Sequence, residues 1–231
     1  YPNLEYVIQD GGSRDNTPAI LDRYRARLTH CESTPDRGQA QAINRGFRRT
    51  SGDVLAYLNS DDLLLPGAVA YVAAYLEQHP DIDVVYGHRI VIDENDADVG
   101  RWVLPPHDAG ALLWFDYVPQ ETLFWRRRIW DKIGGLDESF QYALDWDLLL
   151  RFLAAGARFA RLPRFLGAFR VHPAQKTTAL WHSVGVPETN RLLQRCHGRT
   201  ISTKERFLRI LPYLCRHALW HKFYRFGVFS Y

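Results

Sequence analysis

The sequence predicts an α/β fold, with a mostly parallel central sheet flanked by helices and a helical, basic C-terminal extension. Short apolar runs typical of buried strands alternate with segments of helical spacing from residue 1 to about residue 173. Because parallel strands need crossover connections, this alternation favours a sheet that is covered by helices on both faces. With 231 residues, 46% of them hydrophobic, the chain can bury a sizeable core. We expect one domain over residues 1–173 and the extension over residues 174–231.

The N-terminal part is expected to form a strand and two helices. Leu4 to Gln9 is typical of a strand, and Thr17-Pro18 supplies an N-cap followed by a proline at the first helical position. The first helix carries apolar residues on one face, namely Ile20, Leu21, Tyr24 and Leu28. A second helical face carries Ala40, Ile43 and Phe47.

The middle of the chain continues the alternation. Strands are expected over residues 53–58, 84–86, 89–92 and 121–125, and a further strand-like run precedes His172. Helices are expected over residues 69–76 and 145–153. The first of these helices should end at His79-Pro80, because the residue before a proline disfavours helical geometry.

Cysteine content and hydropathy indicate the compartment. The three cysteines, Cys31, Cys196 and Cys215, are far apart and match neither a disulfide framework nor a zinc-binding spacing. The sequence has no run approaching the ~18 to 20 apolar residues of a membrane span, and its first residues do not resemble a signal peptide. A cytoplasmic location is therefore expected.

Positive charge is concentrated at the C-terminal end. Residues 191–231 contain nine Lys or Arg and one acid, Glu205, whereas the whole chain has a net charge of +3. The basic residues alternate with aromatic residues and leucines, as in an amphipathic helix on an anionic membrane surface. That interpretation places the protein peripherally on the inner face of the membrane, whereas a tail packed on the body or on a second subunit explains the pattern equally well. Nucleic acid is not expected as a partner, because no binding motif accompanies the charge.

Two adjacent carboxylates follow a predicted buried strand. Asn59-Ser60-Asp61-Asp62 comes directly after residues 53–58, where an open α/β sheet has its ligand crevice. Carboxylate oxygens suit Mg²⁺ or Mn²⁺, and such a cation completes its shell with water and substrate phosphates. The structural alternative is a turn that caps the next helix, because Asp and Ser favour caps and turns. The tetrapeptide alone leaves both interpretations open.

Four motifs occur in order along residues 1 to about 173. They are Asp10-Gly-Gly-Ser-Arg-Asp15, Asp36-Arg-Gly-Gln-Ala-Gln-Ala-Ile-Asn44, Gly52-Asp-Val-Leu-Ala-Tyr-Leu-Asn-Ser-Asp-Asp62, and Gly134-Gly-Leu-Asp-Glu138 followed by Asp145-Trp-Asp-Leu-Leu-Leu-Arg151. Each motif alone is weakly specific, but their order and spacing resemble those of family 2 glycosyltransferases. The resemblance implies a nucleotide-diphospho-sugar-binding, GT-A-like fold and an inverting sugar transfer.

The resemblance assigns the first two motifs to the donor nucleotide. Asp10 would contact uracil or another base, while Gly12 and Ser13 let the backbone turn closely past a ligand. Arg37 and Gly38 would lie near the nucleotide, where an arginine can meet a diphosphate with charge-assisted bonds. An Asx-turn is the structural alternative for Asp10, and a solvated surface charge is the alternative for Arg37.

The third motif is expected to hold the metal. Asn59-x-Asp61 resembles the family's Asp-x-Asp motif, with asparagine in place of the first acid, and Asn59 and Ser60 are expected to contact the nucleotide sugar. Asp61 is the first candidate metal ligand and Asp62 the second. His172 is a further candidate metal ligand or diphosphate contact, because neutral imidazole suits Mn²⁺ better than Mg²⁺, with a structural histidine as the alternative. The expected cofactor is a divalent cation, Mn²⁺ or Mg²⁺, that offsets charge on the leaving diphosphate.

Asp145 is the candidate catalytic base. It precedes an apolar helix and resembles the family's catalytic aspartate, although Leu144 stands where an acid usually precedes it. An N-cap role is the structural alternative, and there the helix dipole would lower the pKa of the carboxyl group. Gln120 and Glu121 are expected on the acceptor side.

The expected activity is a non-processive transfer of one sugar from a nucleotide-diphosphate donor, a UDP-sugar first, to a saccharide or lipid-linked acceptor. The Gln-x-x-Arg-Trp sequence associated with processive synthases of the family is absent. One departure from the family pattern is that the first βα unit does not precede Tyr1. A nucleotidyltransferase and a non-catalytic sugar-binding or membrane-associated protein therefore stay open as alternatives.

Overall fold

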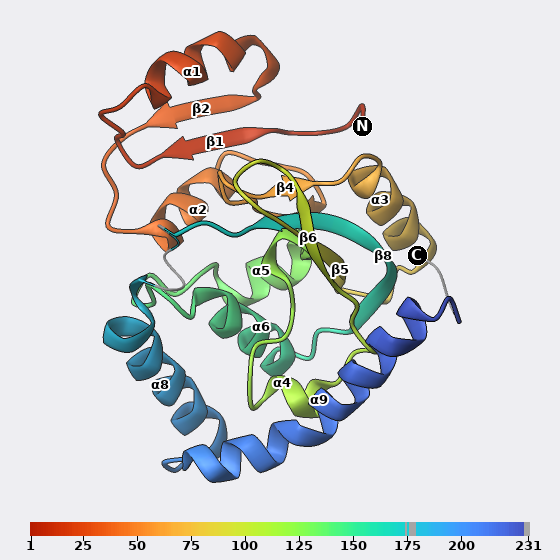
Figure 1. The fold of residues 1–231 in the computed structure, drawn as a ribbon. Helices are drawn as coiled ribbons and strands as arrows, with labels where there is room; N and C mark the ends of the chain where they lie inside the picture. Colours follow the sequence, from red (N-terminus) through yellow and green to blue (C-terminus); the bar gives the residue numbers. More distant parts are fainter. Residues whose placement is uncertain (174, 176–178, 229–231) are drawn as a thin grey trace.

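The computed structural model describes residues 1–173, 175 and 179–228 as an α/β fold (Figure 1). The main sheet has the strand order β3 (Val54–Leu55), β7 (Phe124–Arg126), β5 (Val84–Ile92), β8 (Phe159–Arg170) and β4 (Leu63–Leu64), and β6 (Asp98–Trp102) also pairs with β5. A separate two-stranded sheet consists of β1 (Val7–Asp10) and β2 (His30–Ser33). The predicted fold class is confirmed.

The main sheet is mixed rather than mostly parallel. Among the described residues, β1 with β2 and β5 with β8 are parallel pairs, whereas β3 with β7, β5 with β7, β5 with β6 and β4 with β8 are antiparallel. The expectation of mostly parallel pairing is corrected on this point. An apolar run fixes the burial of a strand but does not encode the direction in which it pairs with its neighbours.

The helices in the described part of the chain are α1 (Thr17–Tyr24), η1 (Arg25–Arg27), α2 (Gln39–Phe47), α3 (Ala68–Gln78), α4 (Ala109–Leu112), η2 (Gln120–Thr122), α5 (Arg127–Ile133), α6 (Leu144–Ala154), η3 (Trp181–Gly185), α8 (Val186–His197) and α9 (Thr203–Arg225). The four helices predicted within residues 1–173 are present as α1, α2, α3 and α6, whereas α4 and α5 were not predicted. The predicted helical faces around Ala40 and Val72 are confirmed as the buried sides of α2 and α3. The N-cap position of α1 belongs to Asn16 rather than Thr17, and Pro18 lies in its first turn.

The two strands expected at 84–86 and 89–92 are one strand, β5, with Gly87 in its middle. A Cβ on Gly87 would lie 2.5 Å from the backbone oxygen of Arg164, so β8 approaches β5 more closely than a side chain allows. The parallel register with β8 shifts on either side of His88, which marks an irregularity at this point. The glycine therefore keeps one strand continuous where the sequence pattern is interrupted.

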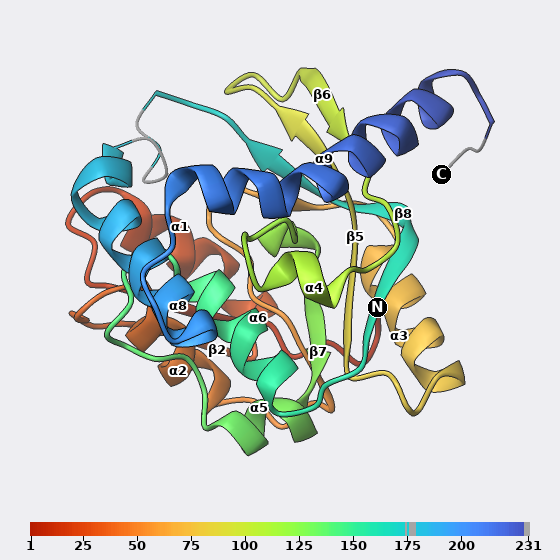
Figure 2. The same cartoon turned by 90° about the horizontal axis from the view of Figure 1, so that it is seen from below.

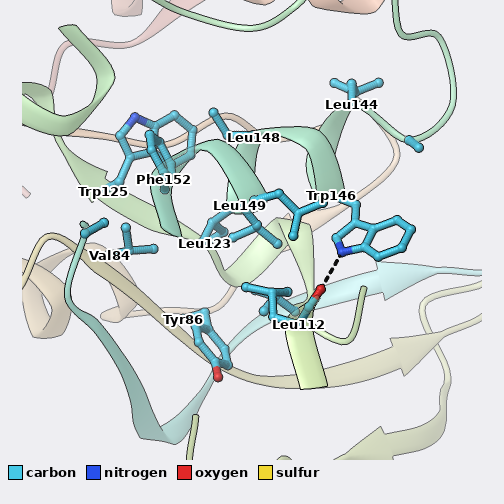
Figure 3. Packing of buried hydrophobic residues seen from close by; sticks show 14 of the residues in the cluster. Val84, Tyr86, Leu112, Leu123, Trp125, Leu144, Trp146, Leu148, Leu149 and Phe152 are labelled. Carbon is cyan, nitrogen blue, oxygen red and sulfur yellow. Dashed lines mark hydrogen bonds between the residues drawn. The ribbon is translucent and has the colours of Figure 1, made fainter. Parts of the chain in front are cut away.

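The core lies on both faces of the main sheet, because successive residues of a strand point to opposite faces. Val84 and Trp125 face the larger cluster, which includes Leu148, Leu149 and Phe152 of α6 (Figure 3). In the same cluster, the Trp146 indole donates a hydrogen bond from Nε1 to the Leu112 backbone oxygen (2.8 Å). The neighbouring residues Val85 and Phe124 belong to a second cluster, formed with Val72 and Leu76 of α3. Helices thus cover both faces, as the sequence predicts.

The C-terminal helices pack on this same body. Leu192 and Leu193 of α8 and Tyr213 of α9 are buried in the larger cluster. α9 runs over α4 along the outside of the molecule (Figure 2). One side of the basic segment is therefore packed on the body. In the described part of the chain, no helix is long and apolar enough to cross a membrane.

Candidate active site

Asn59 connects the turn after β3 to two other elements. Its side chain accepts a hydrogen bond from Gln39 Nε2 at the start of α2 (2.6 Å) and donates one to Gln120 Oε1 in η2 (3.1 Å). Gln120 Nε2 in turn donates to the Tyr57 backbone oxygen (2.6 Å). A bond from Asp62 N to the Asn59 backbone oxygen (3.2 Å) closes the turn. Groups far apart in the sequence therefore hold this turn in one conformation.

Asp61 and Asp62 lie in different environments although they are adjacent. Asp62 is buried, and its carboxylate accepts hydrogen bonds from Arg170 N (3.0 Å) and Asn59 Nδ2 (3.3 Å). Burial raises the pKa of Asp62 to about 6, against the effect of these hydrogen bonds. The Asp61 side chain is 42% exposed, and its Oδ2 lies 3.2 Å from His172 Nε2. The structure thus brings Asp61 and His172 together and turns Asp62 inward, toward β8.

Asp61 and His172 offer one oxygen and one nitrogen ligand at the surface. Among the residues that the structure describes, no group of three His, Cys, Asp or Glu side chains could hold a metal ion. A hard cation needs few protein ligands when substrate phosphates and water complete its shell, and a neutral imidazole is a common metal ligand. The pair therefore fits a divalent cation that is shared with a diphosphate. Asp62 fits less well, because its carboxylate is buried and already accepts two hydrogen bonds.

Asp10 organises the glycine-rich loop after β1. Its carboxylate accepts hydrogen bonds from the hydroxyl groups of Ser13 and Ser33 (2.5 Å each) and from the backbone N–H groups of Gly12 (3.1 Å) and Ser13 (2.9 Å). The hydroxyl bonds, that of Ser13 first, lower the pKa of Asp10 to about 2. Gly12 has a φ of 86°, a conformation that favours glycine. The turn considered for Asp10 from the sequence is present, and its contact with a base stays a prediction.

The first two motifs approach each other closely. A Cβ on Gly11 would lie 2.7 Å from Asp36 Oδ2, so only a glycine leaves room for that carboxylate in its present position. Asp36 Oδ1 accepts a hydrogen bond from Gly38 N (2.8 Å), and Gly38, with a φ of 130°, directly precedes α2. The loop after β1 therefore lies directly beside the start of α2.

The start of α2 is also joined to the fourth motif. Glu138 Oε2 accepts a hydrogen bond from Arg37 Nη2 (2.8 Å) and another from Gln41 Nε2 (3.1 Å). The buried Asn44 exchanges two hydrogen bonds with the backbone of Leu136, each 2.9 Å long. The Arg37 side chain is nevertheless 79% exposed, so a ligand can reach it.

Asp145 lies in the first turn of α6, and the N-cap position belongs to Ala143. The N-cap role considered for Asp145 from the sequence is therefore wrong. The Glu188 carboxylate of α8 binds the N–H groups just before the helix instead. It accepts from Gln141 N (2.8 Å), Tyr142 N (2.9 Å) and Ala143 N (2.8 Å). The role of Asp145 as a base stays a prediction.

The two residues expected on the acceptor side are both buried in η2. The Glu121 carboxylate is fully buried and forms a two-point ion pair with Arg89, whose Nε lies 2.7 Å from Glu121 Oε1. With both oxygens paired, Glu121 has a structural role in this conformation. Gln120 is joined to Asn59 as described, and its contact with an acceptor stays a prediction.

Four residues that hold the site together were not among the predicted site residues, namely Gln39, Asn44, Arg170 and Glu188. Asn44 has a signal, because it falls on the apolar face of Ala40, Ile43 and Phe47, and a buried amide there needs partners. The other three act on groups 20 or more residues away, so no local pattern reveals them.

The fold, with its acidic turn after β3 and an aspartate at the start of α6, defines the class of GT-A-type α/β proteins. Residues 1–138 match the family model described as glycosyl transferase family 2. The chain belongs to this family.

Curated relatives with sequence similarity are also glycosyltransferases by name. A PGL/p-HBAD biosynthesis glycosyltransferase of Mycobacterium bovis is 29% identical over 163 residues, which are 69% of this chain and 62% of the relative. An uncharacterised glycosyltransferase of Mycobacterium tuberculosis is 30% identical over 152 residues, 64% of this chain and 56% of the relative. The chain thus spans about 60% of the length of these relatives.

Two solved structures share the fold. S. aureus TarS in complex with UDP-GlcNAc has a TM-score of 0.66 and 17% identity, with 92% of this chain and 63% of that chain covered. The mannosyltransferase PcManGT from Pyrobaculum calidifontis, in complex with GDP-Man and Mn²⁺, has a TM-score of 0.62 and 20% identity, with 94% and 61% covered. At these identities the likeness concerns the fold.

Proposed function

We propose that this protein transfers a single sugar from a nucleotide-diphosphate donor to an acceptor hydroxyl, with inversion at the anomeric carbon and with the help of a divalent cation. The observation that carries the proposal is the held turn after β3, which presents Asp61 to solvent 3.2 Å from His172 Nε2. Membership of glycosyl transferase family 2 supports it.

The proposed donor site lies among the loops that carry residues of the first three motifs. Asp10, Gly12 and Ser13 would meet the base, Arg37 and Gly38 the diphosphate, and Asn59 and Ser60 the sugar nucleotide. The close approach of Gly11 to Asp36 supports one continuous site for these groups. A UDP-sugar is the proposed donor, and the neighbouring folds were solved with UDP-GlcNAc and with GDP-Man.

Asp61 and His172 would hold the cation, with Asp62 behind them. A divalent cation in this place supplies positive charge that offsets the charge on the leaving diphosphate. The exposed guanidinium of Arg37 would add charge-assisted bonds to the same group.

Asp145 is the proposed base. Its carboxylate would take the proton of the acceptor hydroxyl while the acceptor oxygen bonds to the anomeric carbon and the bond to the diphosphate breaks on the opposite side. One such displacement inverts the anomeric configuration. The proposed acceptor is a saccharide or a lipid-linked saccharide, with Gln120 on its side of the site. The proposed location is cytoplasmic and peripheral to the inner face of the membrane.

The products separate this activity from its alternatives. The protein is incubated with Mn²⁺, UDP-GlcNAc or GDP-Man, and a panel of saccharide and lipid-linked acceptors. Release of nucleoside diphosphate together with a glycosylated acceptor is expected, and Asp145→Asn should lower the rate by ~10²-fold or more. Pyrophosphate as the product would indicate a nucleotidyltransferase, and donor binding without any turnover would indicate a non-catalytic binding protein.

A further inference from the structure

α9 is fixed on the body by one side. Tyr213 is buried, Arg216 forms an ion pair with Asp108 of the α4 N-cap, and Arg206 Nε donates a hydrogen bond to the Trp114 backbone oxygen (3.1 Å). Near the other end of α9, the Tyr224 hydroxyl accepts a hydrogen bond from Arg101 Nη1 (2.6 Å). Contacts along the helix therefore decide which side of α9 faces the body, and the helix itself lies on the outside of the molecule (Figure 2).

The outward side carries large apolar residues at helical spacing. Phe207 is 52% exposed, Leu208 55%, Leu211 37%, Leu214 37% and Leu219 48%. Residues at spacings of three, four, seven and eleven lie on one side of a helix, so these side chains form one stripe, the α9 face. Contiguous exposed apolar side chains of this kind mark an interaction surface.

The charged residues beside this stripe have one sign. Within α9, all of whose residues are described, the exposed charged side chains are Lys204, Arg209, Lys222 and Arg225, and Arg209 lies over the Trp114 ring of the body. The single acid of the helix, Glu205, is paired with Arg199. Lys204 and Lys222 occupy positions in line with the stripe near its two ends, so the α9 face combines apolar side chains with a positive rim.

We propose that the α9 face docks on an anionic lipid bilayer, with the helix lying in the plane of the interface. Burial of its leucines and Phe207 among acyl chains supplies apolar contact, while the lysines and arginines meet lipid phosphates. A second copy of the chain fits less well, because two α9 faces would bring basic residues against basic residues without an exposed acid in either helix. The α9 face would be the surface by which the protein reaches its proposed peripheral location. Its role in bringing the site to a lipid-linked acceptor rests on the proposed function.

Vesicle co-sedimentation tests the docking. The intact protein should bind vesicles of phosphatidylcholine with phosphatidylglycerol much more strongly than pure phosphatidylcholine vesicles. Lys204→Gln with Lys222→Gln should lower the partition coefficient on the order of 30-fold, since each of the two lysines near an anionic surface contributes a factor of about five to binding. Binding should also weaken sharply between about 0.1 M and 1 M salt, where the screening length falls from ~10 Å to ~3 Å.

Matched variants identify the surface. Leu208→Gln with Leu219→Gln should reduce binding about ten-fold or more, whereas Val99→Gln on β6, which is 56% exposed, should leave it unchanged. Arg23→Gln with Arg27→Gln serves as the charge control, because both residues are exposed and distant in sequence from α9. All these substitutions are at exposed positions, so thermal unfolding should confirm that each variant folds.

The outcomes are decisive for the α9 face. Equal binding of the α9 variants and the controls, or no preference for anionic vesicles, overturns the proposal. A dimer in light scattering that dissociates in the Leu208→Gln, Leu219→Gln variant, without vesicle binding by the intact protein, assigns the face to a second copy instead. Calorimetry with UDP and Mn²⁺ on the same variants keeps the two proposals apart, since donor binding should not change when docking is lost.

Discussion

Arg195 of α8 and Asp147 of α6 form an ion pair in which the carboxylate is almost completely buried. Arg195 Nη2 lies 2.6 Å from Asp147 Oδ1, and the Asp147 side chain is 1% exposed. Arg151 approaches the other carboxylate oxygen at 3.5 Å. The basic extension is therefore tied directly to the helix that carries Asp145.

Arg195→Gln should destabilise the protein by about 1–3 kcal/mol, because it leaves the buried Asp147 with the longer Arg151 contact alone. Arg191→Gln in the same helix is the matched control. Arg191 lies 3.8 Å from Asp137, and the two side chains are 53% and 35% exposed, so a loss of less than about 1 kcal/mol is expected there. Urea unfolding of both variants measures the difference, and equal losses would contradict a special role for the buried pair.

Glu188→Ala removes the acceptor for three N–H groups that precede α6. If these bonds position Asp145, kcat should fall about ten-fold while KM for the donor stays within about two-fold, since the change concerns the proposed base and not the donor site.

The conservative variant Glu188→Asp, which keeps a carboxylate, should recover part of kcat. Glu205→Gln is the control, because it changes an acid of α9 that pairs with Arg199 before the helix. It should leave both kcat and KM unchanged. A rise in KM with constant kcat after Glu188→Ala would show that α8 acts on the donor site instead.

Asp61→Ala should abolish the enhancement of UDP binding by Mn²⁺ without loss of thermal stability, because Asp61 is exposed and its side chain lies beside His172. His172→Ala should weaken the enhancement in part. Calorimetry with and without Mn²⁺ measures both effects, with the exposed Asp131→Ala as control. Metal enhancement that persists unchanged in Asp61→Ala would sink the assignment of this ligand.

Asp10 should make stability depend on pH at the acidic end. Its pKa is lowered to about 2 in the folded protein by the hydroxyl groups of Ser13 and Ser33, against an ordinary value of 3.8. The unfolded chain therefore binds a proton first as pH falls, so the contribution of Asp10 is complete above about pH 4 and is lost between about pH 4 and pH 2.

Urea unfolding between pH 5 and pH 2 tests this dependence. Asp10→Asn should be less stable than the wild type at pH 7 and should lose less stability on acidification. Ser33→Ala, which removes one of the four hydrogen bonds, should fall between the two. Identical pH profiles for wild type and Asp10→Asn would refute the effect.

Element type was predictable where the pattern is local. The apolar faces of α2 and α3 and the run at β5 depend on the spacing of neighbouring residues, and burial followed that spacing. The strands β2, β4 and β6 were not predicted. They are short or polar, and pairing with a neighbouring strand stabilises them rather than burial of an apolar run of their own.

The sequence by itself determined the α/β class, the helices α2, α3 and α6 and the presence of carboxylates after a buried strand, because these follow from local spacing and residue chemistry. Only the tertiary structure decided that Asp61 faces solvent beside His172 while Asp62 is buried against Arg170 N. In the tertiary structure, Glu188 rather than Asp145 accepts the hydrogen bonds of the N–H groups before α6. The physical reason is the same in each case, since a polar group is satisfied by whichever partner the packing of distant elements brings within hydrogen-bond distance.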